Sequence, residues 1–141
     1  MKSLLTVQSI AAMWVLAAVA HAGELTVTIT DIHEAKGFLM VSLVNSDAAW
    51  NNQDKPVAVR KIAAVQGEVK LQFKDVAPGT YAVQVMHDEN GNDKLDTNFL
   101  GIPTEGYGFS NNPNLMRKAH YDEARFDVGA GAANNITIRL R

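Results

Sequence analysis

The stretch Glu68–Met86, EVKLQFKDVAPGTYAVQVM, decides the fold class because it reads as two alternating strands joined by a turn. Apolar and polar side chains alternate from Val69 to Phe73, and again from Tyr81 to Val85. A period of two is the pattern of a half-buried β-strand. The dipeptide Pro78-Gly79 lies between the two strands and predicts a type II turn, with positive φ at the glycine.

Five further short strands are predicted by alternation or by short apolar runs, at residues 24–30, 38–44, 57–64, 124–128 and 136–140. Short helical turns are expected after Ser46, which can cap a turn ending at Trp50, and over residues 114–120. Seven short strands without long helical periods are typical of a β-sandwich. We therefore predict an all-β fold, a seven-stranded antiparallel β-sandwich with one long ordered loop and at most short helical turns.

The first 22 residues have the pattern of a secretory signal peptide. A positive charge at Lys2 precedes a mostly apolar run, and Ala20-His21-Ala22 has the small-x-small form of a cleavage site. Cleavage after Ala22 would leave one domain, residues 23–141, in the periplasm or secreted. A retained membrane anchor is the alternative, which needs about 20 strongly apolar residues and is weakened here by Thr6, Gln8 and Ser9.

Composition excludes several classes of function. The formal net charge is −2, so the chain as a whole lacks the basic character expected for binding nucleic acid or an anionic membrane. It contains no cysteine, which excludes disulfides, thiol chemistry and thiolate metal sites. After signal cleavage no membrane span is expected.

The polar stretch Asp88–Asp96 is a candidate calcium loop. Oxygen-bearing side chains stand at its first, third, fifth and ninth positions, which is the spacing of calcium loops; they are Asp88, Asn90, Asn92 and Asp96. Two residues depart from that pattern, because Asp93 replaces the glycine of the sixth position and Phe99 replaces the glutamate of the twelfth. The alternative is a loop rich in Asn, Asp and Gly because these residues suit turns.

Residues 98–112 are richer in aromatic and aliphatic side chains, and they predict an ordered loop folded back on the sandwich. Its apolar side chains are expected to pack down on the domain; they are Phe99, Leu100, Ile102, Tyr107 and Phe109. Such loops often carry function. The candidates for a binding surface are Glu105, Tyr107, Phe109 and Trp50.

Signals for catalysis are few. The chain has no HExxH, GxSxG or glycine-rich phosphate motif. A hydrolase using Glu105 with His87 or Asp88 is the less favoured alternative, and His87 with His120 is a weak candidate metal pair. We assign no catalytic residue, and calcium is the one cofactor considered.

Three motifs closely resemble bacterial domain-of-unknown-function family 2141. They are PGxYAV at Pro78–Val83, DxNxNxxxD at Asp88–Asp96, and GxPxEGYGFSN at Gly101–Asn111. The family usually has glycine where this chain has Asp93. The resemblance implies a small exported domain, similar to prealbumin-like or Ig-like sandwich modules, without an established activity.

Three hypotheses about function follow. A binding or interaction module, recognising protein or carbohydrate at the cell envelope, would expose Tyr107, Phe109 or Trp50 beside the loop. A hydrolase would bring its carboxylates and histidine to a common point. A structural domain, stabilised by calcium, would bury the aromatic rings.

Overall fold

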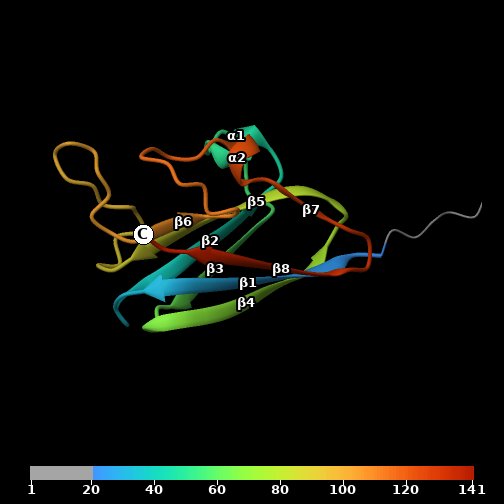
Figure 1. The fold of residues 1–141 in the computed structure, drawn as a ribbon, viewed down its shortest axis with the longest axis horizontal. Coiled ribbons are helices and arrows are strands. Elements are labelled where there is room, and N and C mark those ends of the chain that lie inside the picture. Colours follow the sequence, from blue (N-terminus) through green and yellow to red (C-terminus); the bar gives the residue numbers. More distant parts are fainter. Residues whose placement is uncertain (1–20) are drawn as a thin grey trace, which may run out of the picture.

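The computed structural model describes residues 21–141 (Figure 1). The signal peptide predicted over residues 1–22 therefore lies outside the described residues, except for His21 and Ala22. Strand β1 begins at Gly23, the first residue of the mature chain that the cleavage site predicts. Within residues 21–141, no helix has the length and apolar character needed to cross a membrane.

The first sheet has three strands in the order β4–β1–β8. β1 (Gly23–Ile32) pairs antiparallel with β4 (Gly67–Val76) and parallel with β8 (Ala133–Arg139). The parallel pair departs from the predicted antiparallel pattern. Alternation reveals a strand but not its direction of pairing, and no hairpin links β1 to β8 to impose one.

The second sheet has the order β3–β2–β5–β6, and β7 pairs with the start of β5. Its strands are β2 (Phe38–Val44), β3 (Ala58–Ala63), β5 (Gly79–Asp88), β6 (Tyr107–Phe109) and β7 (Phe126–Val128). The all-β sandwich is thus confirmed, with eight strands instead of seven. The additional strand is β6, which lies inside the segment predicted to be loop.

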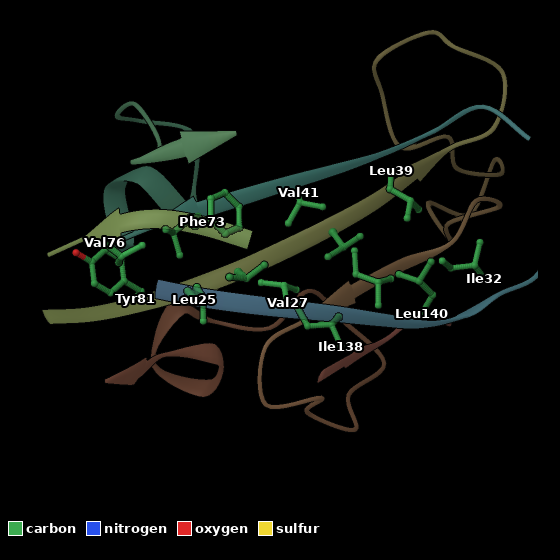
Figure 2. Packing of buried hydrophobic residues seen from close by; sticks show 14 of the residues in the cluster. Leu25, Val27, Ile32, Leu39, Val41, Phe73, Val76, Tyr81, Ile138 and Leu140 are labelled. Atoms are coloured by element: carbon green, nitrogen blue, oxygen red, sulfur yellow. The ribbon is translucent and has the colours of Figure 1, made fainter. Parts of the chain in front are cut away.

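The core lies between the inner faces of the two sheets, as Figure 2 shows. β1 contributes Leu25, Val27 and Ile29, all fully buried, and they alternate with partly exposed threonines as the sequence predicts. Each buried aliphatic side chain contributes about 1.5–3 kcal/mol. Tyr81 of β5 and Ile138 of β8 lie in the same core, so the two sheets pack against each other through it.

The turn before β5 differs from the prediction. Gly79 has φ 159°, which is extended backbone, so the turn at Pro78-Gly79 is not of type II. The left-handed conformation occurs earlier, at Asp75 with φ 56°. The Tyr81 hydroxyl donates to the Ala77 carbonyl at 2.7 Å and closes the turn from within.

One end of the outer face of the second sheet is covered by a separate apolar group, the outer cluster, which consists of Val44, Ala49, Trp50, Ala82, Phe109, Ala119 and Ala124. Two short helices contribute to it, α1 (Asp47–Trp50) and α2 (Tyr121–Ala124), which lie side by side above the sheet in Figure 1. Ser46 caps α1 by accepting the Ala49 N–H at 3.1 Å, as predicted. The helix predicted over residues 114–120 is wrong, because that segment is irregular.

Candidate functional site

Asp88 ends β5, and its carboxylate organises the loop that follows. The side chain is fully buried. Its Oδ1 accepts the N–H groups of Gly91 at 2.8 Å and Asn92 at 3.1 Å, and its Oδ2 accepts that of Asp93 at 2.9 Å. Burial raises the pKa of Asp88, but the three backbone donors and the positive charge of Lys61 together more than offset this, so the pKa lies below its ordinary value. Asp88 is therefore a charged group that is held in place by the backbone.

The other three predicted calcium ligands meet across the loop. The Asn92 amide donates to both carboxylate oxygens of Asp96, at 2.9 and 3.1 Å, and the Asn90 amide donates to the same carboxylate. Both amides thus turn their nitrogen towards Asp96. A half-turn of either amide would present its oxygen instead.

Asp93 adopts the backbone conformation of the glycine that calcium loops have at their sixth position. Its φ is 59°, in the left-handed region that favours glycine, so the loop keeps the turn expected at this position. The Asp93 carboxylate forms a salt bridge of 2.6 Å with Lys61 on β3. Among residues 21–141, no three His, Asp or Glu side chains come close enough together to hold a metal ion. A cation here would depend on the oxygens of Asn90 and Asn92.

Glu105 joins the two ends of the polar loop. It is almost fully buried, and its Oε1 accepts the Glu89 N–H at 3.0 Å while its Oε2 accepts the Asp96 N–H at 2.9 Å. The two ends are thereby held to the start of β6. Both carboxylate oxygens are occupied by backbone donors, which leaves Glu105 as a positioning residue for the loop.

His87 is buried and also bonds to the backbone. Its Nε2 lies 2.7 Å from the Lys36 carbonyl oxygen, which can only accept, so Nε2 is protonated and donates. In the described part of the chain, no hydrogen bond joins His87, Asp88 and Glu105 to one another, and each contacts different backbone groups. His120 precedes α2 at the other end of β5, since Tyr121 donates to the Thr80 carbonyl.

The predicted aromatic candidates form a row that leads out of the outer cluster. Trp50 is 1% exposed, and its ring centroid lies 5.5 Å from that of Phe109, which is 9% exposed. Phe109 in turn lies 5.7 Å from the half-buried Tyr107. The burial of Trp50 and Phe109 is the outcome expected for a structural domain. Tyr107 lies where the outer cluster ends, and it lines the groove described next.

A groove of about 1070 Å³ lies on the part of the second sheet's outer face that the outer cluster leaves open. Its floor consists of two rows of side chains across strands β2, β5 and β6. The register places Met40, Met86 and Tyr107 in one row and Ser42, Gln84 and Phe109 in the next. The row after that contains Val44 and Ala82, which the outer cluster covers.

Two irregular segments form the walls of the groove. One wall is residues 95–103, where Phe99 is 95%, Leu100 68% and Ile102 55% exposed. The prediction that these three side chains pack on the sandwich is therefore wrong. The other wall is residues 114–118, and the Arg141 guanidinium holds it by donating to the Leu115 carbonyl at 3.0 Å and to that of Pro113. Both segments rise beside β6 in Figure 1.

The rim of the groove is mostly basic. Its lining contains four cationic side chains and one carboxylate; they are Lys94, Arg117, Lys118, Arg141 and Asp93. Asp93 is neutralised by Lys61, and Arg117 by Glu123 at 2.9 Å. Over residues 21–141 neither Lys94 nor Lys118 has a carboxylate within salt-bridge distance, so the groove carries local positive charge on an acidic chain.

The sequence did not point to this groove. Alternation along β5 does place Gln84 and Met86 on the outer face, which the structure confirms. What covers that face depends on where residues 95–103 and 114–118 lie, and neither segment has a regular pattern. The three methionines of the groove, Met40, Met86 and Met116, therefore carry no signal when the sequence is read alone.

One comparison with known proteins gives a match. The model of a family described as "Uncharacterized protein conserved in bacteria (DUF2141)" matches residues 27–137, which is most of the chain. No match is found among curated proteins or among solved structures.

Proposed function

This chain belongs to DUF2141, a family of uncharacterized bacterial proteins, and we propose that it is a non-catalytic binding module of the cell envelope. The groove on the outer face of the second sheet receives the apolar part of a ligand. Export to the periplasm or out of the cell is part of this proposal. It rests on the leader-like residues 1–22.

The observation that carries the proposal is the exposure of apolar side chains around a concave surface. Leu100 and Ile102 on one wall and Met116 on the other are exposed to solvent. Exposed apolar patches on a folded domain mark binding sites, and ligand grooves are concave, apolar and equipped with a few polar groups. Methionines suit such a site, because their flexible thioethers adapt to different shapes.

Binding of the neutral fluorescent dye Nile red tests the proposal. The protein with residues 23–141 is expected to bind the dye with a blue shift and a rise in fluorescence. Leu100→Ser combined with Ile102→Ser removes apolar area from one wall and should weaken dye binding about tenfold. Urea unfolding of the same variant shows whether its fold is intact.

Val65→Ser is the matched control, because Val65 is exposed to a similar degree but lies outside the groove. It should leave dye affinity unchanged. Equal dye binding by the wild type, the groove variant and the control would refute the proposal, as would an absence of binding to the wild type.

Calcium stabilisation of the polar loop is a second candidate function, favoured by a different observation. The side chains of Asn90, Asn92 and Asp96 meet at one point, and the buried Asp88 fixes the backbone around it. Asp93 supplies the left-handed turn in place of glycine. Calcium prefers oxygen ligands, and rotation of the two amides would bring their oxygens together with the Asp96 carboxylate around one ion.

Thermal unfolding with millimolar calcium and with a chelator tests this candidate. Calcium should raise the midpoint by several degrees through binding to the folded state alone. Asp88→Ala and Asp96→Ala should abolish the shift. Asp93→Gly is the matched control within the same loop, because it removes only the carboxylate that bonds to Lys61 and keeps the left-handed turn, and it should keep the shift. An unchanged midpoint for the wild type would exclude the site.

A further inference from the structure

The floor of the groove changes from apolar to polar along the strands. The row Met40–Met86–Tyr107 lies between the apolar side chains of the walls. The row Ser42–Gln84–Phe109 adds the Ser42 hydroxyl and the Gln84 amide. Within residues 21–141, neither of these two side chains forms a hydrogen bond to another protein group. An occupant with one apolar end and one polar end would match this order.

The polar end also holds a cation, Lys118, that forms no salt bridge with any carboxylate of residues 21–141. The Lys118 ammonium donates to the Trp50 carbonyl at 2.8 Å and lies 5.3 Å from the centre of the Trp50 ring, which places it where the outer cluster meets the groove. Desolvation lowers the pKa of Lys118 from its ordinary value, and the negative charge of Asp47 offsets this only in part, so an anion bound beside Lys118 would further favour its charged form. Asn52, at the end of α1, lines the groove with it and offers an amide donor.

A peptide strand is a poor occupant for this groove. Peptides that extend a sheet need a strand edge with free backbone groups. At the β6 edge, Tyr107 already exchanges two backbone hydrogen bonds with Arg141, at 3.1 and 3.0 Å. The volume of about 1070 Å³ slightly exceeds that of most small-molecule sites, which range from about 300 to 1,000 Å³.

We propose that the groove binds a single-chain anionic amphiphile, a long-chain carboxylic acid. The hydrocarbon tail lies on Met40, Met86 and Tyr107 between the two walls. The carboxylate lies at the other end, where Lys118 and Asn52 donate to it. This inference rests on the proposed binding function and specifies the chemistry of the ligand.

Displacement of Nile red by tetradecanoate and by the matched neutral alcohol, tetradecanol, tests the inference below the concentrations at which either aggregates. The wild type should bind the acid about tenfold more tightly than the alcohol, because the charged pair forms only with the acid. Lys118→Gln should remove this preference and leave alcohol binding unchanged, whereas Lys118→Arg should retain most of it.

Lys94→Gln is the matched control, because it removes the same charge from another part of the groove lining, next to the wall at residues 95–103, and should keep the preference. Because Lys118 also contacts Trp50, its substitution could disturb the outer cluster as well as the charge. The salt dependence of binding to the unsubstituted protein avoids this problem. Raising the salt concentration should weaken binding of the acid and leave binding of the alcohol unchanged.

Equal affinity for acid and alcohol, or a preference that persists in Lys118→Gln, would overturn the inference while leaving the binding function intact. Binding only to anionic lipid vesicles, without displacement of the dye by the free acid, would also overturn it. Failure of dye, acid and alcohol alike to bind would instead refute the proposed function itself.

Discussion

Glu105 is a buried carboxylate that holds the two ends of the polar loop together. Its two carboxylate oxygens accept the N–H groups of Glu89 and Asp96, which stand at the two ends of the polar loop. Glu105→Ala should lower the free energy of unfolding by about 1–3 kcal/mol, because two partly buried donors lose their acceptor. Urea unfolding measures this loss, and hydrogen exchange at the amides of Glu89 and Asp96 should become faster.

Glu105→Gln keeps one acceptor oxygen and should give an intermediate loss. Glu68→Ala, at an exposed position on β4, removes a carboxylate without backbone partners and should change stability by less than about 1 kcal/mol. Unchanged exchange at Glu89 and Asp96 in Glu105→Ala would show that the loop is held by other contacts.

The sequence singles out Glu105 as an acidic residue between glycine-rich turns, but it does not reveal what the carboxylate bonds to. The partners are backbone groups, whose identity depends on how the loop closes and not on their side chains. The same applies to Asp93, where the departure from glycine is visible in the sequence and its left-handed φ of 59° is not. Residue types therefore predict candidate ligands better than they predict contacts.

At the scale of elements, the wall at residues 114–118 is tied to α2 by an ion pair that should respond to pH. Arg117 donates to both carboxylate oxygens of Glu123, and the His120 N–H donates to the same carboxylate at 2.7 Å. The Arg117 hydrogen bonds, together with the His120 donor, lower the pKa of Glu123 from 4.5 to about 2. Because the folded pKa is depressed, this contribution to stability is present above pH 4.5 and is lost as the pH falls through about 2.

Titration of the Glu123 carboxyl by NMR should give a midpoint near 2, and the thermal midpoint should fall between pH 4.5 and 2. Glu123→Gln should lower the midpoint at neutral pH and reduce its dependence on pH in that window. A Glu123 midpoint near 4.5 would show that the ion pair does not persist in solution.

The elements that sequence reasoning missed are those with weak local signals. β6 is three residues, Tyr107–Phe109, with a glycine at its centre, and neither length nor propensity marks it as a strand. The helix expected over residues 114–120 is absent, and the helical turn begins at Tyr121, where Glu123 bonds back to the His120 N–H. The long alternating strands β1, β4 and β5 were predicted correctly because burial of one face dictates their pattern.

At the scale of the molecule, period-two alternation was enough to predict two packed sheets and most of the core between them. It could not predict that β8 pairs parallel to β1, since both directions place Ile136 and Ile138 at positions of the same parity. Nor could it predict the exposure of Phe99, Leu100 and Ile102. Apolar composition alone predicts burial, whereas the walls of a groove keep their apolar side chains exposed.

The closure of the sandwich beside the groove depends on the absence of a side chain at Gly108. A Cβ atom there would lie 2.7 Å from Ile138 Cγ2 and 2.9 Å from the Arg139 carbonyl oxygen, closer than such atoms approach. Gly108→Ala should therefore separate β6 from β8 and lower the free energy of unfolding by about 1–3 kcal/mol. Because β6 supplies part of the groove floor and Arg141 follows β8, the variant should also bind Nile red more weakly.

Gly129→Ala is the matched control, since a Cβ at Gly129 would meet only the Ala132 side chain, at an ordinary distance of 3.7 Å. It should leave both unfolding in urea and dye binding close to those of the wild type. If Gly108→Ala were as stable as Gly129→Ala, β6 could not approach β8 as closely as the structure places it. If it lost stability but kept full dye affinity, the groove would not depend on this contact between the two sheets.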